Sequence, residues 1–130
     1  MKSKIVVDSS ANVYELPDVG FACVPLKILT DEQEYVDTAE VDAPALAQMM
    51  RTYKGRTSTS CPNISDWMAA YEGADEVYVV TITGTLSGAY NAALLRARST
   101  SRATRARGSL CWTACLLVRS PGCWWSVWRR

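Results

Sequence analysis

Short apolar runs alternate with amphipathic segments over the first two thirds of the chain. The β-branched and apolar runs predict strands at residues 4–7, 23–29, 33–36 and 76–83. Helical spacing predicts helices at residues 42–53, from a cap at Asn63 or Ser65 through Tyr71, and from residue 88 onward. Strands that alternate with helices indicate an α/β fold with a mostly parallel sheet flanked by helices.

Pro25 lies inside the second predicted strand. Proline offers no N–H to a β-ladder, so it is confined to edge strands, strand starts and bulges. The pattern therefore predicts that residues 23–29 form an edge strand or that the strand begins near this proline.

Three hydroxyl-rich turns occupy the ends of predicted elements, at residues 8–10, 57–62 and 83–88. In an open α/β sheet, ligands bind outside the carboxyl ends of the strands. The third turn leads directly into a helix, whose free N–H groups and positive dipole end favour an anion. Gly84 and Gly88 would let a ligand approach the backbone. The turn therefore predicts an anion seat at Ser87, and Thr59 in the second turn is expected at the same edge.

These residues also have a purely structural interpretation. Serine and threonine commonly cap helices and close turns without binding a ligand. Asp8 follows a strand, where its carboxylate could hold the neighbouring loop by accepting N–H bonds, and this is the role that we expect for it. Ser9 and Ser10 are expected only as residues of a loop beside the site.

Composition divides the chain in two. Residues 1–95 hold all 13 acidic residues and six basic ones, a net charge of −7, whereas residues 96–130 hold eight arginines and no acidic residue, a net charge of +8. Four of the five tryptophans also fall in the second part. With 48% hydrophobic residues, the 130-residue chain suits one domain. The opening residues contain no apolar run long enough for a signal peptide, which predicts a cytoplasmic protein.

Several chemistries are excluded by residue type. The chain has no histidine, so neither a Ser-His-Asp nor a Cys-His arrangement exists in it. It also lacks the phosphate-binding loops G-x-x-x-x-G-K-[ST] and G-x-G-x-x-G. An α/β enzyme or binding protein for a phosphorylated small molecule stays open as an alternative, although no motif supports it.

Four segments occur in an order and spacing that resemble a known family: VVDSSANV, VPLKI with a following EYVD, TSTSCPN, and ITGTLSGAYNAA. Together they resemble the amino-terminal half of DegV fatty-acid-binding proteins over residues 3 to about 95. The resemblance implies a two-domain α/β protein that encloses a long-chain fatty acid in an apolar tunnel. It also implies a carrier rather than an enzyme, without cofactor or metal, that presents the acyl carboxylate to a separate fatty acid kinase.

The resemblance assigns roles to particular residues. The Thr-Ser motif of the family falls on Thr59 and Ser60, and its Gly-x-Ser-Gly serine falls on Ser87, followed by Gly88. These residues would bind the fatty-acid carboxylate, in agreement with the anion seat. Cys61 stands where many relatives have glutamine, so a polar contact from this position is not expected.

Residues 96–130 do not resemble the family. When the codons of Cys111-Trp112-Thr113 are read one nucleotide earlier, they must encode Leu-Asp, and the following codons permit LDSLSAGPE, which is similar to the next DegV segment. We therefore predict a one-nucleotide frameshift near Leu95. The amino-terminal domain would end there, the second domain would be absent, fatty-acid binding would be impaired, and residues 96–130 would be irregular or disordered.

The residues of this tail have alternative interpretations. Three cysteines, Cys111, Cys115 and Cys123, without histidine make a poor zinc site. Eight arginines among tryptophans could bind nucleic acid through charge and stacking. An out-of-frame reading of a GC-rich gene gives the same composition, so no nucleic-acid partner is predicted.

Overall fold

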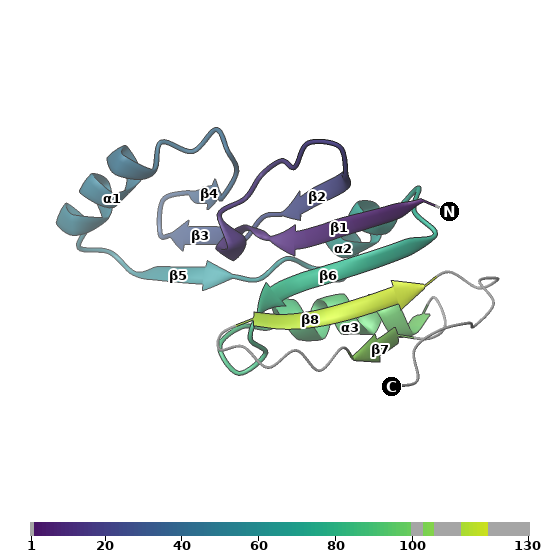
Figure 1. Ribbon diagram of the computed structural model, residues 1–130. Helices are drawn as coiled ribbons and strands as arrows, with labels where there is room; N and C mark the ends of the chain where they lie inside the picture. Colours follow the sequence, from purple (N-terminus) through teal and green to yellow (C-terminus); the bar gives the residue numbers. More distant parts are fainter. Residues whose placement is uncertain (1, 100–102, 106–112, 120–130) are drawn as a thin grey trace.

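The computed structural model describes residues 2–99, 103–105 and 113–119, which form two sheets and three α-helices (Figure 1). The five-stranded sheet has the order β2-β1-β6-β8-β7, and the three-stranded sheet has the order β4-β3-β5. The first sheet comprises β1 (Ser3–Asp8), β2 (Gly20–Val24), β6 (Glu76–Ile82), β7 (Ala103–Arg105) and β8 (Thr113–Arg119).

The centre of the five-stranded sheet is parallel, which confirms the predicted α/β class. β1 lies between β2 and β6 and pairs in parallel with both, so that Val6 is opposite Ala22 on one side and Val79 on the other. β8 and β7 add antiparallel strands at one edge. β1 is therefore paired along both of its edges, and its last residues, Val6 to Asp8, are buried.

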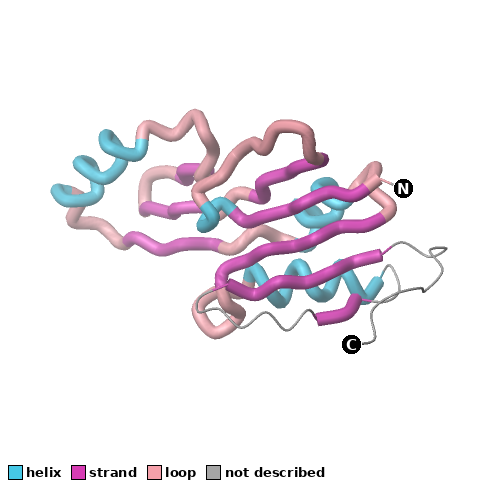
Figure 2. Tube along the Cα trace, viewed as in Figure 1, coloured by secondary structure: helices cyan, strands magenta, loops and turns pink. Residues whose placement is uncertain are grey.

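Two helices cover one face of this sheet, namely α2 (Ile64–Tyr71) and α3 (Ala89–Ser99) (Figure 2). Asn63 starts α2 as predicted, because its side chain accepts the N–H of Asp66 at 3.0 Å while the Asp66 carboxylate accepts the N–H of Asn63 at 2.9 Å. Fully buried Ala89 and Ala93 let α3 lie close to the sheet. The core between these layers comprises Val6, Val24, Trp67, Tyr71, Val77, Val79, Ala89 and Ala93.

The second sheet is antiparallel and comprises β3 (Lys27–Thr30), β4 (Glu34–Val36) and β5 (Thr57–Ser60). α1 (Ala43–Thr52) connects β4 to β5 and begins at Asp42, whose side chain accepts the N–H of Ala45 at 2.9 Å. Figure 1 shows that this sheet and α1 lie beyond the carboxyl ends of β1, β2 and β6.

Two sequence predictions about this region are wrong. The single strand predicted at residues 23–29 is two strands, because the chain leaves the first sheet at Pro25 and begins β3 at Lys27. The expectation drawn from Pro25 is confirmed, since β2 is an edge strand and β3 begins near the proline. Residues 57–60, predicted as part of a turn, form β5, which suits the β-branched side chains of Thr57 and Thr59.

Part of the segment 96–130 also differs from the irregular tail that we predicted. α3 continues to Ser99, and β8 pairs with β6 over the whole of Thr113–Arg119. The residues of β8 are mostly apolar or β-branched, and these residue types favour strands. A strand can therefore form here whether or not the codons are read out of frame. The frameshift remains a prediction, which resequencing of the coding DNA across codons 90 to 125 tests.

The pairing of β8 with β6 predicts slow hydrogen exchange. In the whole chain, the amides of residues 113–119 should be protected about as well as those of β6, because each strand supplies the other with hydrogen-bond partners. Exchange measured by mass spectrometry on peptides that cover both strands tests this. Rapid exchange of residues 113–119 beside a protected β6 would contradict the pairing.

Trp67 should contribute strongly to the packing of α2 and α3 against the parallel sheet. Its side chain is fully buried, and its Nε1 has no hydrogen-bond partner within the described residues. Trp67→Ala should lower the free energy of unfolding by about 3–5 kcal/mol. Trp67→Phe should cost much less, because phenylalanine fills most of the volume and removes the unpaired donor. Urea unfolding of both variants is the measurement. Equal losses would contradict the packing argument, because both variants lack the indole N–H and differ in the volume that they fill.

Candidate functional site

A cavity of about 470 Å³ lies where the two sheets meet the start of α3. One wall comes from the second sheet and the segment before it, and the other comes from the end of β6 and the turn that follows. The lining residues are Leu26, Lys27, Ile28, Asp37, Thr59, Cys61, Ile82, Leu86, Ser87 and Gly88. Thr59, Ser87 and Gly88, three of the four predicted ligand-binding residues, are among them.

Ser87 is held by the tight turn between β6 and α3. The N–H groups of Leu86 and Ser87 both donate to the carbonyl of Thr83, at 3.0 and 3.2 Å. The Ser87 hydroxyl oxygen accepts the N–H of Ala89 at 3.2 Å, so this side chain caps the helix. Its hydroxyl proton is still available to donate, and the positive end of α3 lies beside it. The residue therefore combines the capping role with the geometry of an anion seat.

Thr59 and Ser60 are on opposite faces of β5. Successive side chains of a strand point to opposite sides. Thr59 lines the cavity together with Ile28, its partner across the ladder. Ser60 is not a lining residue, and its hydroxyl donates to the carbonyl of Cys61 at 3.3 Å. The structure thus brings Thr59 to Ser87 and turns Ser60 away from them.

The two glycines of the third turn also have packing roles. A Cβ atom on Gly88 would lie 2.9 Å from the Sγ atom of Cys61, which is closer than real Cβ contacts. A Cβ atom on Gly84 would lie 2.9 Å from Cδ1 of Tyr90. Gly88 thus lets the segment around Cys61 approach the start of α3 and lines the cavity, whereas Gly84 is not a lining residue.

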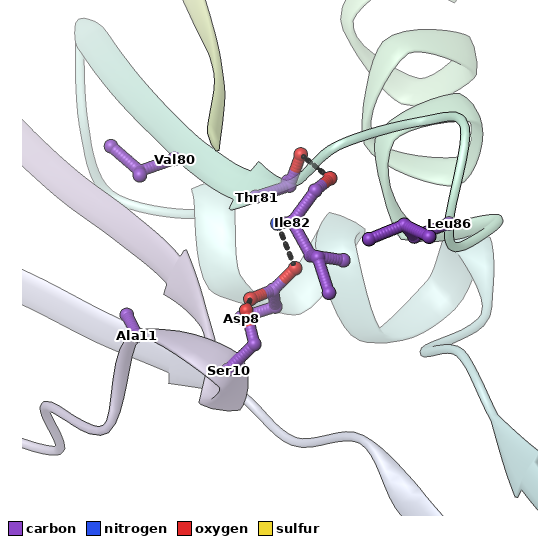
Figure 3. A pocket seen from close by; sticks show the side chains of 7 residues that line it. All are labelled: Asp8, Ser10, Ala11, Val80, Thr81, Ile82 and Leu86. Carbon is purple, nitrogen blue, oxygen red and sulfur yellow. Dashed lines mark hydrogen bonds between the residues drawn. The ribbon is translucent and has the colours of Figure 1, made fainter. Parts of the chain in front are cut away.

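The turn at residues 8–10 hydrogen-bonds to Ile82, which lines this cavity, and Figure 3 shows Asp8 bonded to both Ile82 and Ser10. Asp8 is fully buried, and its carboxylate accepts the N–H of Ile82 at 2.9 Å and the hydroxyl of Ser10. Ser9 accepts the N–H of Leu26 at 3.0 Å through its side-chain oxygen. Asp8 therefore has the structural role that we expected for it.

A second, smaller cavity of about 250 Å³ adjoins the first, because Ile82 and Leu86 line both. Asp8 and Ser10 line one side of it, and the remaining lining residues are Ala11, Val80 and Thr81 (Figure 3). The sequence analysis did not single out Leu26, Ile82 or Leu86. Their only signal was apolar character next to the motifs, which core residues share.

Both charged residues that line the cavity have hydrogen-bond partners of their own. The Lys27 ammonium contacts Glu34 at 2.8 Å, and this hydrogen bond raises the pKa of Lys27. By strand register, the Lys27 side chain is on the face of β3 opposite to that of Ile28 and Thr59. Asp37 accepts the hydroxyl of Tyr14 at 3.1 Å. The hydroxyls and backbone N–H groups are therefore the donors best placed to meet an anion here.

Cys23 is not activated as a nucleophile. Cys23 and Cys61 are free thiols. Burial, followed by the negative charges of Asp37 and Asp8, raises the pKa of Cys23 to about 11. Because the thiolate is the reactive form, Cys23 stays protonated and unreactive at neutral pH.

The described residues contain no group of three His, Cys, Asp or Glu side chains that could hold a metal ion. The tail cysteines Cys111 and Cys123 and the tail tryptophans lie outside the described residues, and so does the side chain of Cys115. No helix in the described part of the chain is long and apolar enough to cross a membrane.

Several solved structures are similar to this fold. A DegV family protein from Eubacterium eligens loaded with heptadecanoic acid matches with a TM-score of 0.71 at 37% identity, over 75% of this chain and 35% of that one. The Fatty Acid Kinase (Fak) B3 protein of Streptococcus pneumoniae, loaded with linoleic acid, matches with a TM-score of 0.72 at 36% identity, over 76% of this chain and 37% of that one.

Curated relatives give the same result. A DegV domain-containing protein of Streptococcus pneumoniae is 37% identical over 99 residues, which cover 73% of this chain and 35% of the relative. One from Streptococcus gordonii is 38% identical over 97 residues, 72% of this chain and 34% of the relative. The chain thus spans about a third of the length of the relatives that it matches.

The family model that describes uncharacterised proteins of the DegV family matches residues 2–111. The match continues beyond residue 95, where the resemblance seen in the sequence ended. Because it includes most of the chain, the protein belongs to the DegV family.

Proposed function

We propose that the cavity at the start of α3 binds the carboxylate of a long-chain fatty acid, and that the protein carries this ligand without transforming it. The observation that supports the proposal most directly is the convergence of Thr59, Ser87 and Gly88 on one cavity whose other walls are largely apolar. Leu26, Ile28, Ile82 and Leu86 supply those apolar walls; this amphipathic lining suits a carboxylate attached to an alkyl chain.

The polar end of the seat offers two kinds of donor. The Thr59 and Ser87 hydroxyls can each donate a hydrogen bond, and the first turn of α3 adds backbone N–H groups and a positive dipole end. Each hydrogen bond to a charged group is worth roughly 1.5–3 kcal/mol. These groups would fix the position and direction of the carboxylate.

The acyl chain would supply most of the affinity. Each methylene removed from water contributes about 0.8 kcal/mol, so a long chain outweighs the two hydroxyl contacts when it is fully enclosed. The chain would leave the seat past Ile82 and Leu86, the two residues shared with the second cavity.

Relatives with bound fatty acids support the same ligand class. The Eubacterium eligens protein holds heptadecanoic acid, and the Streptococcus pneumoniae protein named for a fatty acid kinase holds linoleic acid. We extend the proposal to the partner: the protein would present its acyl carboxylate to a separate fatty acid kinase. Since such a kinase needs a nucleotide phosphate donor, the proposed place of action is the cytoplasm.

Binding to the present chain should be detectable as weak, localised shifts. In an NMR titration of the 130-residue chain with decanoate below its micelle concentration, the amides of Thr59, Ser87 and Gly88 should shift together. Thr59→Ala and Ser87→Ala should each weaken binding about tenfold, since each removes a donor to a carboxylate. Thr57→Ala is the matched control, because Thr57 is on the same strand but does not line the cavity.

The titration also separates the other ligand classes. Shifts at the same amides with inorganic phosphate but not with decanoate would favour a phosphorylated small molecule. Unchanged decanoate affinity in both alanine variants would refute the carboxylate seat. Salt-sensitive binding of an oligonucleotide, with no response to decanoate, would favour the nucleic-acid alternative.

The present chain should bind long fatty acids much more weakly than a full-length relative. Four methylenes left in water already cost roughly 3 kcal/mol, so linoleic acid should bind at least about a hundredfold less tightly than to the Streptococcus pneumoniae protein. The chain should also fail to support acyl phosphate formation by a fatty acid kinase. Calorimetry and a kinase assay on both proteins are the measurements, and comparable one-to-one binding would contradict this account of the affinity.

A further inference from the structure

The turn at residues 8–10 hydrogen-bonds to both sides of the cavity without lining it. Ser9, which is 3% exposed, accepts the N–H of Leu26 at 3.0 Å. Asp8, which is fully buried, accepts the N–H of Ile82 at 2.9 Å. Leu26 precedes β3 and Ile82 ends β6, so neighbouring residues of one turn bond to the segments that carry the two walls.

The connection continues to a third lining residue. The carbonyl of Leu26 accepts the N–H of Asp37 at 2.9 Å, and Asp37 lines the same cavity. A displacement of Leu26 would therefore move Asp37 as well. Three of the lining residues thus depend on hydrogen bonds that start from the turn after β1.

Pro25 makes the Ser9 bond important. Proline has no N–H, so the N–H of Leu26 is the first backbone donor after β2 ends at Val24. Ser9 accepts that donor just where the chain leaves the parallel sheet. In the described residues no strand of one sheet pairs with a strand of the other, so this bond is one of the direct links between the two sheets.

We propose that Ser9 and Asp8 are positioning residues that set the distance between the two walls of the cavity, an inference that rests on the proposed function. Ser9 fixes the Leu26 wall, which belongs to the second sheet, and Asp8 fixes the Ile82 wall, which belongs to the parallel sheet. Because an acyl carboxylate has to meet Thr59 on one wall and Ser87 on the other at once, a change in wall separation weakens binding even though neither positioning residue lines the cavity that holds the carboxylate.

The test is a series of substitutions at Ser9 in the whole chain, with decanoate as the ligand. Ser9→Ala removes the acceptor for Leu26, Ser9→Cys replaces it with a weaker one, and Ser9→Thr retains the hydroxyl. Ser3→Ala is the matched control, since Ser3 begins β1, the strand that leads into the turn at residues 8–10; its hydroxyl donates to Glu76 at 3.4 Å, and it lies at the opposite end of that strand from the turn. Affinity is measured by NMR at a temperature where each variant is folded, and Tm is measured in parallel.

Ser9→Ala should weaken decanoate binding about threefold to tenfold, which is the change in Kd expected for the loss of one hydrogen bond of ordinary strength. Ser9→Cys should have an intermediate affinity. Ser9→Thr should bind about as well as the unmodified chain. The Leu26 and Asp37 amides should shift in the alanine variant without ligand. Ser3→Ala should change Tm without changing affinity. If Ser9→Ala does not fold, Ser9→Cys gives the same comparison.

Two results would overturn the inference, and they are distinguishable. If the unmodified chain binds decanoate at Thr59 and Ser87 and the Ser9 variants bind it equally well, the positioning role is wrong while the proposed function stands. If the unmodified chain shows no saturable binding at these residues, the proposed function fails and the inference fails with it. A lowered Tm in Ser9→Ala at constant affinity would assign Ser9 a stabilising role only.

Discussion

The missing N–H of Pro25 is the constraint from which the arrangement of the site follows. β2 pairs with β1 as far as Val24, and a proline at the next position cannot extend a ladder that requires a donor. The chain therefore turns out of the parallel sheet and starts a second, antiparallel one at Lys27. β3 then pairs Ile28 with Thr59, which brings a residue from the middle of the chain to the end of β6 and the start of α3.

The elements that could be predicted from sequence are those with strong local signals. β6 has a long β-branched run, α2 has a capping residue at Asn63, and α3 follows a glycine-flanked turn. β5 was missed because four consecutive hydroxyl residues satisfy the composition of a turn and of an exposed strand equally well. Only the partner strand β3 decides between them, and pairing between distant segments is not visible in local pattern.

The same limit applies to the site. Ser87 was identified because a helix N-terminus is a local feature that serine at that place makes recognisable. Ser60 was assigned with Thr59 as one motif, but strand alternation separates neighbours onto opposite faces. Leu26, Ile82 and Leu86 carry no motif at all, so their place on the cavity follows from the contact of two sheets rather than from residue type. The place of a polar residue at a helix N-terminus is thus easier to predict from sequence than the place of the apolar residues that line the same cavity.

The structural and binding roles of the polar residues reinforce each other. Ser87 caps α3, and the cap is what holds its hydroxyl at the positive end of that helix. Asp8 is buried, and burial of a carboxylate is tolerable only because Ser10 and the Ile82 N–H satisfy it. The apolar side of the site is less complete, since Leu86 is 62% exposed although it lines both cavities. In the described chain, the direction of the proposed ligand would therefore be set by groups whose hydrogen bonds are satisfied, whereas the burial that would supply affinity requires further apolar surface over Leu86.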